Sequence, residues 1–384
     1  MLIGIEIVFF IALLLVIHSY LLYPASLAFL SAIGKRYEFY DAGKPTTEKI
    51  SILISAYNEA ATIKKRITGL LSIDYPSFEV IVGVDGATDG TAEILQEIGD
   101  NRLKVIRYET NRGKVWVLND LYEHTDGSIL MFTDANTDLN QNALAMLERH
   151  FGDERVGGVS GRQETRPYHG SKEMRVESEY WKIESWIKQR EGDRGMTLGG
   201  NGSVYAIRRD LFMPFDTQSR IADDFILPLK VIEKGYYFVY EPEAVAIEQS
   251  GDLKGEFRRK MRIGAAVSAT LKAARPLMNP SKGFIAYSLW SHKIIRWFVP
   301  YLLVIILISN ILLLSQAEIF RIGVIVQFVF YSIAAVGIFG LSTRIQIPIV
   351  AQLGYFVVAN AALFTGITKA LVRHPETKWE VSRN

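Results

Sequence analysis

The fold is decided by Lys49-Ile-Ser-Ile-Leu-Ile-Ser-Ala-Tyr57, a short stretch rich in β-branched residues that shows no helical period. Such a run predicts a strand that is buried on both faces of a sheet. Three further runs, at 79–84, 104–108 and 128–133, have a similar character. Helical patterns separate these strands, so the sequence predicts an α/β domain built on a mostly parallel sheet.

Polar turns follow three of the four predicted strands, at the edge where ligands bind in parallel sheets. The turns are Ala56-Tyr-Asn-Glu59, Asp85-Gly-Ala-Thr-Asp89-Gly90-Thr91 and Asp134-Ala-Asn136-Thr-Asp138. A further turn, Arg112-Gly-Lys114, carries a lysine that could meet a phosphate or could simply be solvated. Capping of the next helix explains Asp89 or Thr91 but leaves Asp85 unexplained. Carboxylates at a strand end suit a hard divalent cation that carries phosphates.

The composition excludes several classes of function. The chain has 384 residues, with 43 Lys and Arg against 41 Asp and Glu, a net charge of +2 and 0 Cys. A near-neutral total gives no basic surface for nucleic acid, so we expect no nucleic-acid partner. The lack of Cys removes disulfides, thiol nucleophiles and Cys-zinc sites. The 6 His residues form no His-x-x-x-His pair, and we assign no zinc site.

Both ends of the chain are apolar, whereas its middle is charged. Residues 2–33 contain no Lys or Arg and a single acid, and a membrane span needs about 20 apolar residues. We therefore expect a retained transmembrane helix, because a cleaved signal peptide would begin with basic residues. Three more spans are predicted, at about 297–315, 322–341 and 346–368. The alternative for all of these segments is a soluble all-helical domain.

Basic residues that flank the spans predict their direction. Lys35-Arg36 and the pair Lys293 and Arg296 place the central block in the cytoplasm, at an inner (plasma) membrane. Three later spans would leave the tail outside, yet the tail from Lys369 carries four basic residues against two acidic ones, which favours the inside. Either one predicted span is re-entrant or the bias of the tail carries no weight.

These patterns divide the chain into five parts. They are an N-terminal transmembrane helix at 1–34, a cytoplasmic α/β domain at 46–250, amphipathic interfacial helices at 251–296, three transmembrane helices at 297–369 and a basic tail at 370–384. In the interfacial part, Phe257, Met261 and Leu271 fall near one helical face, which suits a helix that lies on the membrane surface.

The order of the motifs resembles that of the family-2 glycosyltransferases. The nucleotide-sugar half of that family resembles Ala56-Tyr-Asn-Glu59, Asp85-Gly-x-x-Asp89-Gly, Gly113-Lys114 followed by Asn119, and Asp134-Ala-Asn136. Gly199-Gly-Asn-Gly-Ser203 resembles the acceptor-side loop, and Asp223-Asp224 resembles the segment that holds the catalytic base. The resemblance covers about Lys49 to Arg262, and the spans suit the membrane-bound branch, to which hyaluronan, poly-N-acetylglucosamine and cellulose synthases belong.

The resemblance implies the GT-A nucleotide-diphospho-sugar transferase fold and a role for each matching residue. Asp224 would be the general base and Asp223 the acid that precedes it. Contacts to the nucleotide sugar would come from Ala56, Glu59, Asp85, Lys114, Asp134 and Arg262, contacts to the acceptor from Gly200, Asn201 and Gly202, and ligands for Mg²⁺ or Mn²⁺ from Asp134 and Asn136. Structural alternatives exist, since one residue of the Asp223-Asp224 pair could cap a helix and the glycines could form a tight turn.

The chain departs from the family pattern at two places. Asn136 stands where the family usually has a second Asp, so this position offers a neutral oxygen, and Asp138 could compensate. Processive members carry Gln-x-x-Arg-Trp where this chain has Arg259-Lys-Met-Arg262-Ile263. Arg262 is therefore kept, while the Gln and the Trp are missing.

The expected enzyme is an inverting hexosyl- or N-acetylhexosaminyltransferase at the inner membrane. It would move a sugar from a UDP-sugar to a growing polysaccharide or a lipid-linked glycan, and it could work as a homo-oligomer or in a synthase complex in the lipid bilayer. The alternatives are transfer of one sugar to a polyprenyl-linked acceptor, which the missing Gln and Trp favour, and a non-catalytic partner of another synthase. A transporter fits least, because the spans carry almost no charge.

Overall fold

The computed structural model describes residues 2–33, 47–166, 174–217, 222–249, 253–342 and 347–372, which form two compact units. The catalytic unit comprises the described residues 47–166, 181–217 and 222–249. The membrane unit comprises the described residues 2–33, 174–180, 253–342 and 347–372. The predictions for Lys35-Arg36 and for most of the basic tail fall outside the described residues.

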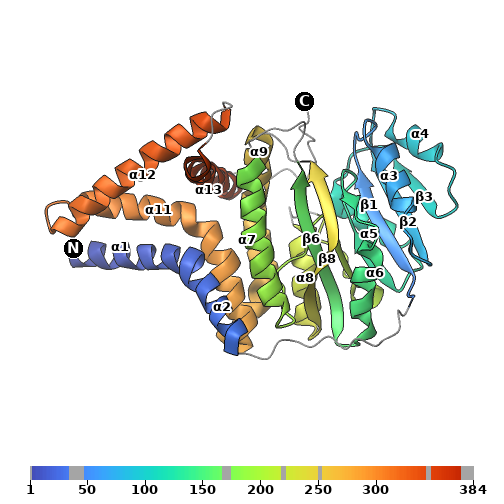
Figure 1. The fold of residues 1–384 in the computed structure, drawn as a ribbon, viewed down its shortest axis with the longest axis horizontal. Coiled ribbons are helices and arrows are strands. Elements are labelled where there is room, and N and C mark those ends of the chain that lie inside the picture. Colours follow the sequence, from blue (N-terminus) through green and yellow to red (C-terminus); the bar gives the residue numbers. More distant parts are fainter. Residues whose placement is uncertain are drawn as a thin grey trace. The chain divides into compact units, whose positions relative to one another are not determined.

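One mixed sheet forms the centre of the catalytic unit (Figure 1). Its strands are β1 (Ile50–Ala56), β2 (Phe78–Asp85), β3 (Leu103–Tyr108), β4 (Ile129–Phe132), β5 (Asp138–Leu139), β6 (Val156–Arg166), β7 (Tyr205–Arg208) and β8 (Tyr237–Gln249). Within the described residues they lie in the order β3-β2-β1-β4-β7-β6-β8-β5. β1 pairs in parallel with β2 and β4, and β2 with β3, whereas β7 runs antiparallel to β4 and β6. The four strands predicted from the sequence are thus the parallel half of the sheet, and the predicted α/β class is confirmed.

Helices cover both faces of the sheet. They are α3 (Ile63–Leu71), α4 (Thr91–Gln96), α5 (Lys114–Tyr122), α6 (Ala143–Glu148), α7 (Met174–Gly192) and α8 (Asp223–Glu233), with the short turns η2 (Arg149–Gly152) and η3 (Arg209–Leu211). Ile52 of β1 and Ile67 of α3 belong to one hydrophobic core. Gly83 of β2 points to the opposite face, where a Cβ would press on Val117 and Leu121 of α5. Alternation of side chains along each strand therefore supports a helical layer on either side.

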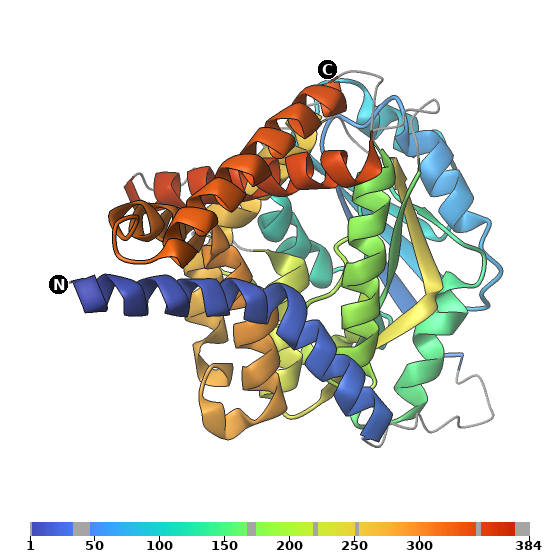
Figure 2. The ribbon, with the colours of Figure 1, turned by 60° about the vertical axis from the view of Figure 1, so that its left-hand side comes forward.

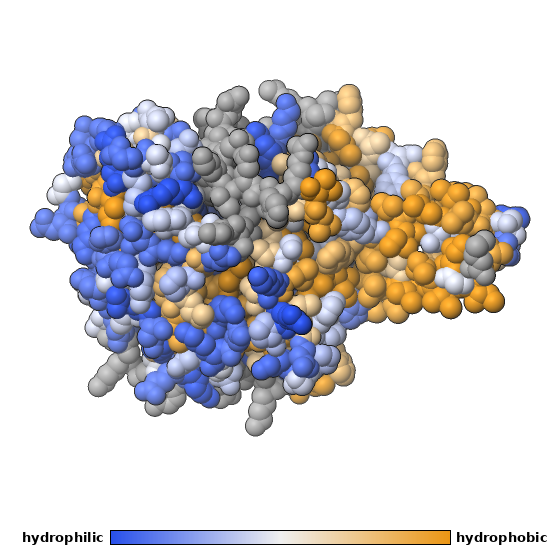
Figure 3. Space-filling view, turned by 180° about the vertical axis from the view of Figure 1, so that it is seen from behind, coloured by the Kyte–Doolittle hydropathy of each residue, from blue (hydrophilic) through white to orange (hydrophobic). Residues whose placement is uncertain are grey.

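Four helical segments of the described residues are long and apolar enough to cross a membrane, the number that the sequence predicts. The first runs through α1 (Leu2–Ile17), η1 (His18–Leu22) and α2 (Tyr23–Ile33), and the second through α10 (Phe284–Ser288), η6 (Leu289–Ile294) and α11 (Ile295–Leu312). The others are α12 (Glu318–Ser342) and α13 (Pro348–Val372). α1 and α11 pack side by side (Figure 2). Apolar side chains gather over this part of the chain (Figure 3), as expected of surfaces that face lipid.

The second segment begins at Phe284, whereas the sequence predicts a span from about residue 297. Polar residues before position 297 lie inside this helix, where they contact side chains of the first segment. His292 is fully buried and stacks on Tyr23, with 5.9 Å between the ring centroids. The guanidinium of Arg296 lies 5.3 Å from the centre of the Tyr20 ring. Contacts between helices far apart in sequence thus allow the helix to continue through polar residues.

The predicted interfacial part, 251–296, is divided between two structures. Its residues before Phe284 form α9 (Leu253–Ala274) and the short turns η4 (Arg275–Leu277) and η5 (Pro280–Lys282), and the rest belongs to the second segment. α9 packs along α13, and a Cβ on Gly264 would lie 2.7 Å from the carbonyl oxygen of Leu363. The hydroxyl of Tyr355 on α13 donates to Glu256 on α9 at 2.6 Å. The buried face of α9 therefore carries small and charged residues, a face other than the apolar one that the sequence suggested.

Replacing Gly83 by alanine tests the packing between β2 and α5. The added methyl would overpack against Val117, so we expect Gly83→Ala to lower the stability of the catalytic unit by about 1–3 kcal/mol. Gly69→Ala on α3 is the control, because a Cβ there has no atom within 4 Å and alanine favours helix. Thermal unfolding of the two purified variants should shift in opposite directions, and equal shifts would contradict this packing.

Candidate active site

The carboxyl ends of three parallel strands bring the predicted motifs to one edge of the sheet. β1 ends at Ala56, β2 ends at Asp85, and β4 ends just before Thr133-Asp134. β1 lies between the other two strands in the sheet. The motif that follows β1 is therefore flanked by the motifs that follow β2 and β4.

A buried ammonium group lies among the acidic residues at this edge. Nζ of Lys114, at the start of α5, lies 2.9 Å from Oδ1 of Asp134 and 3.2 Å from Oδ2 of Asp223. Burial alone would lower the pKa of Lys114, but the carboxylates of Asp134, Asp223 and Asp224 raise it above its ordinary value. Three carboxylates around one ammonium group leave about two negative charges when all are ionised. The cluster therefore attracts cations.

Asp223 and Asp224 form the first turn of α8, and Ala222 occupies the N-cap. The capping explanation for this pair is therefore not what the structure shows. Asp223 also accepts a hydrogen bond from the hydroxyl of Tyr205 at 3.2 Å. Burial, followed by the nearby Asp223 carboxylate, raises the pKa of Asp224 to about 6. Such a group changes its charge close to neutral pH, as a general base requires.

The glycine loop, residues 199–203, faces Asp224. Gly199 has a φ of +79°, a conformation that favours glycine. The N–H of Gly200 donates to the carbonyl oxygen of Asp224 at 2.6 Å. A Cβ on Gly202 would lie 3.3 Å from Oδ2 of the same residue. The loop therefore brings bare backbone close to the carboxylate.

The side chain of Asn201 points into the protein. Only 3% of this residue is exposed; its Nδ2 donates to the carbonyl of Gly161, and its Oδ1 accepts from Nζ of Lys188 at 2.6 Å. The loop is also tied to β4, because the hydroxyl of Thr133 donates to the carbonyl of Ser203 at 2.7 Å. Asn201 thus anchors the loop. Gly202 is partly exposed beside Asp224, whereas the predicted acceptor contact Gly200 is buried against Tyr205.

Asp85 organises the turn that begins α5. Its two carboxylate oxygens accept from the N–H groups of Arg112 and Gly113, both at 2.8 Å, and 1% of the residue is exposed. This arrangement fixes the backbone immediately before Lys114. Asn119, a further residue of the predicted motif, binds the backbone of Phe215 through both ends of its amide.

The loops after β1 and β2 are bonded to each other. The N–H of Glu59 donates to the hydroxyl of Thr91 at 2.9 Å, and the N–H of Ala60 donates to Oδ2 of Asp89 at the same distance. Oδ1 of Asp89 accepts from the N–H of Thr91 at 3.1 Å. Glu59 is 8% exposed and Ala56 is fully buried. Both residues therefore support the edge of the sheet from within.

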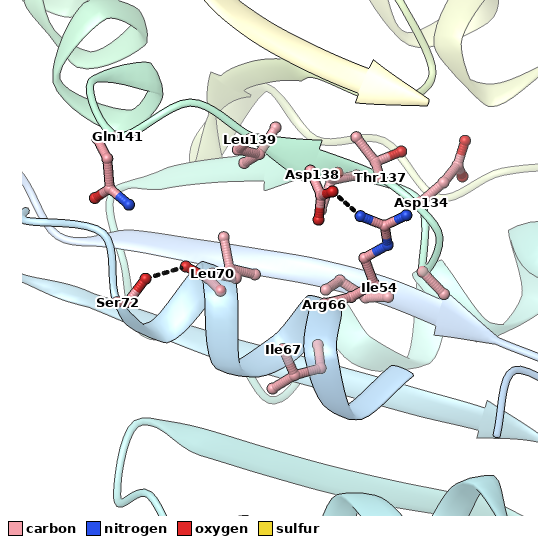
Figure 4. A pocket seen from close by; sticks show the side chains of 13 residues that line it. Ile54, Arg66, Ile67, Leu70, Ser72, Asp134, Thr137, Asp138, Leu139 and Gln141 are labelled. Carbon is pink, nitrogen blue, oxygen red and sulfur yellow. Dashed lines mark hydrogen bonds and ion pairs between the residues drawn. The ribbon is translucent and has the colours of Figure 1, made fainter. Parts of the chain in front are cut away.

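Asp138 is engaged away from Asp134. It forms an ion pair with Arg66 of α3, a residue that is 7% exposed. The two lie in a cavity of about 130 Å³ whose wall includes Asp134, and Figure 4 shows the guanidinium directed at Asp138. Asp138 therefore does not replace the missing second Asp of the metal motif in this structure.

The oxygen donors near the β4 end fit a divalent cation that shares its coordination with a substrate. Asp134 keeps 31% of its side chain exposed, and Asn136 is also partly exposed. Within the described part of the chain, no group of three or more His, Cys, Asp and Glu could hold an ion alone. Mg²⁺ commonly takes one or two carboxylates and completes its shell with phosphates and water. Asp134 offers one such carboxylate, so this strand end fits a cation whose remaining ligands come largely from phosphate and water.

Two residues of the family's Gln-x-x-Arg-Trp motif region lie on α9, in the membrane unit. Arg262 lies on the exposed side of α9 in the membrane unit, so it is not among the residues that the catalytic unit brings together. Arg259, at the position of the family's Gln, pairs with Glu256 at 2.6 Å.

Sequence reasoning gave no role to Tyr205, although it begins a stretch that resembles the family's acceptor-side motif, and it missed Lys188. Tyr205 is fully buried, and its ring stacks on Phe132 with 4.7 Å between the centroids. For Lys188 a signal existed, because Glu184, Lys188 and Glu191 recur at helical spacing on one side of α7, the side that also carries the fully buried Ile187. Charged residues on a buried helix face indicate specific polar partners.

Comparisons with known proteins identify the domain. Residues 51–213 match the model of the family described as Glycosyl transferase family 2. The chain is 27% identical over 241 residues to a poly-β-1,6-N-acetyl-D-glucosamine synthase of Staphylococcus epidermidis, and 25% identical over 241 residues to that of Staphylococcus aureus strain COL. Each match covers 59% of this chain and 58% of the relative, so the chain spans less than two thirds of the curated relatives. The predicted family and glycosyltransferase class are confirmed for this domain.

A solved structure shares the fold. A mannosyltransferase from Pyrobaculum calidifontis, in complex with GDP-Man and Mn²⁺, superposes with a TM-score of 0.72 at 20% sequence identity. The likeness covers 95% of this chain and 99% of the mannosyltransferase. The predicted GT-A fold is therefore confirmed.

Removing the charge of Asp85 tests its role in the turn. In Asp85→Asn one of the two N–H donors, from Arg112 or Gly113, loses its acceptor, so we expect a loss of stability of about 1–3 kcal/mol. Hydrogen exchange at these two amides should quicken in parallel. Glu93→Gln, at an exposed site on α4, is the matched control, and unchanged exchange in Asp85→Asn would contradict the positioning role.

Proposed function

We propose that this chain, which carries a family-2 glycosyltransferase domain, transfers a sugar with inversion from a UDP-sugar to a growing polysaccharide or lipid-linked glycan at the inner membrane. The observation that carries the proposal is the position of Asp224. It is a half-buried carboxylate with a pKa of about 6, beside the glycine loop and next to the Lys114 cluster. A base, a glycine loop beside it and a cation for phosphates therefore lie together.

Asp224 would take the proton of the acceptor hydroxyl as that oxygen attacks the anomeric carbon. The new carbon–oxygen bond forms as the bond to the diphosphate breaks, and the nucleoside diphosphate leaves from the opposite face. A single displacement of this kind inverts the anomeric centre. Asp223, held by Lys114 and Tyr205, keeps the first turn of α8 in place and helps to set the pKa of its neighbour.

Lys114 would contact the diphosphate once a bound divalent cation shares Asp134, the carboxylate that its ammonium group contacts at 2.9 Å. Asp134 and Asn136 would hold Mg²⁺ or Mn²⁺, which supplies charge neutralisation for the leaving group when bound. Ala56, Glu59 and Asp85 would shape the nucleoside side of the site. Arg262 would be a further contact to the diphosphate, a role that rests on its motif.

The named substrates of similar proteins set the order in which donors are tested. The Staphylococcus relatives are poly-β-1,6-N-acetyl-D-glucosamine synthases, which makes UDP-N-acetylglucosamine the first donor to try. GDP-Man is the second, because the mannosyltransferase of similar fold was solved with it and with Mn²⁺. The catalytic unit would face the cytoplasm, since Lys293 and Arg296 lie in the N-terminal half of the second segment, the half that follows the catalytic unit in the chain.

Transfer of a single sugar to a polyprenyl-linked acceptor is the second candidate. Where processive members carry Gln and Trp, this chain has Arg259 and Ile263. Arg259 is paired with Glu256, which in turn binds Tyr355 of α13. This position therefore contributes to helix packing in the membrane unit, and Ile263 offers no aromatic ring for a sugar to stack on.

Replacing Asp224 by asparagine tests the proposed reaction. We expect Asp224→Asn to lower transfer by at least about 100-fold while the affinity for the donor changes little, because general base catalysis contributes about 10²–10⁴ in rate. The measurement is the size distribution of products from membranes supplied with labelled donors and Mn²⁺ or Mg²⁺. Asp210→Asn, at an exposed position, is the control.

The products distinguish the two candidates. A long ladder that the Asp224→Asn variant lacks would support polysaccharide synthesis, whereas one lipid-extractable product would favour single addition. Equal transfer by the variant and the wild-type protein would show that Asp224 is not the base.

The pH dependence provides a second test of Asp224. Its carboxylate must be ionised to accept a proton, so kcat/KM should rise about tenfold per pH unit below about pH 6 and level off above it. The positive charge of Lys114 lowers the pKa of Asp224, so Lys114→Met should move this rise to higher pH. Lys104→Met on β3 is the control, and a rise that stays in place in Lys114→Met would contradict the assignment.

A further inference from the structure

Lys188 of α7 is a buried cation that binds the glycine loop. Only 5% of the residue is exposed. Its Nζ donates to the carbonyl oxygen of Gly200 at 3.0 Å and to Oδ1 of Asn201 at 2.6 Å. Burying an ammonium group is costly unless it makes good hydrogen bonds. The position of Lys188 is therefore closely coupled to the position of these two loop residues.

The segment that Lys188 binds is the one that faces the base. Gly200 donates its N–H to the carbonyl of Asp224 at 2.6 Å, and Gly202 lies so close to Asp224 that an added Cβ would be 3.3 Å from its Oδ2. Asn201 is bound on its other side by β6, because its N–H donates to the hydroxyl of Ser160 at 3.0 Å. Movement of this turn would change the gap between the loop backbone and the base.

We propose that Lys188 is a positioning residue that holds the glycine loop at the distance from Asp224 at which the acceptor hydroxyl meets the base. It acts on the geometry through the loop and does not touch the substrate, and its positive charge also lowers the pKa of Asp224. The inference deepens the proposed glycosyl transfer and rests on it for the identity of the reaction.

A second contact from α7 supports this assignment. Glu191, which is fully buried, accepts from the N–H of Leu198 at 3.1 Å, directly before the loop. Lys188 and Glu191 lie about one helical turn apart. The entry to the loop and its turn are therefore both held by charged side chains of one helix.

The geometry favours lysine over arginine at this position. A lysine ammonium is compact and directs three donors to separate acceptors, whereas the guanidinium of arginine is planar and larger. The carbonyl of Gly200 and the amide oxygen of Asn201 belong to different groups that converge on one nitrogen. An arginine would keep the charge and restore only part of the geometry.

Hydrogen exchange of the full-length protein in detergent tests the anchoring without any substrate. The N–H groups of Gly200, Asn201 and Val204 are all hydrogen-bonded. We expect Lys188→Met to quicken their exchange about tenfold or more, and Lys188→Arg to quicken it less. Lys182→Met, at an exposed position on the same helix, is the control and should leave exchange unchanged.

Steady-state kinetics then test the effect on the reaction. Removing a hydrogen bond to a charged group costs about tenfold to hundredfold, so Lys188→Met should lower kcat/KM for the acceptor by about that factor. The KM for the donor should stay within about twofold. Because both residues act through one turn, Lys188→Met combined with Asn201→Ala should lose no more than the worse single variant.

The outcomes separate the inference from the proposed function. Unchanged hydrogen exchange in Lys188→Met would overturn the anchoring of the loop. Equal losses of kcat/KM for the donor and for the acceptor would overturn the inference that Lys188 affects the acceptor alone. Should Lys188→Met prove unstable, the hydrogen exchange of Lys188→Arg and its kcat/KM for the acceptor decide in the same way. Wild-type protein that transfers no sugar from any donor, yet shows the predicted exchange, would contradict the reaction and leave the anchoring of the loop in place.

Discussion

The gathering of three carboxylates around the buried ammonium group of Lys114 is the constraint on which the rest of the catalytic unit depends. Asp134, Asp223 and Asp224 repel one another at this spacing, and one lysine offsets only part of their charge. Such a cluster is held together by the fold and not by its own electrostatics. Hydrogen bonds fix the backbone around the cluster. Asp85, for example, accepts from the two N–H groups that precede Lys114.

Convergence of distant segments is what a parallel sheet provides. The motifs after β1, β2 and β4 are far apart in sequence, yet parallel pairing brings the carboxyl ends of these strands to one edge. Hydrogen bonds then join the loops, such as the one from the N–H of Glu59 to Thr91 and the one from the hydroxyl of Thr133 to the carbonyl of Ser203. The antiparallel strand β7 completes the site from the other side, because it pairs with β4 and directly follows the glycine loop. The base is therefore positioned by both halves of the sheet.

Much of this arrangement is predictable from the sequence, because local patterns determine the strands and their ends. The runs around Ile52 and Val82 form strands at the predicted positions, and Asp134 follows a strand end as expected. Pairings that depend on tertiary contacts were not predictable. The partner of Asp138 proved to be Arg66, a residue of α3. Polar residues such as His292 lie inside a helix because Tyr23 packs on them. Local spacing cannot indicate such partners.

The same electrostatics gives a physical reason for Asn136. An aspartate at this position would place a further carboxylate two residues from Asp134, beside a group of acids that already repel one another. Like charges raise the pKa of a neighbouring carboxyl group, and that of Asp224 is already raised to about 6 by burial and by Asp223. A further rise would leave the proposed base protonated at neutral pH whenever no cation is bound. In the proposed reaction, Asn136 would offer an amide oxygen without a further negative charge, which would weaken the attraction for a cation and favour an ionised Asp224.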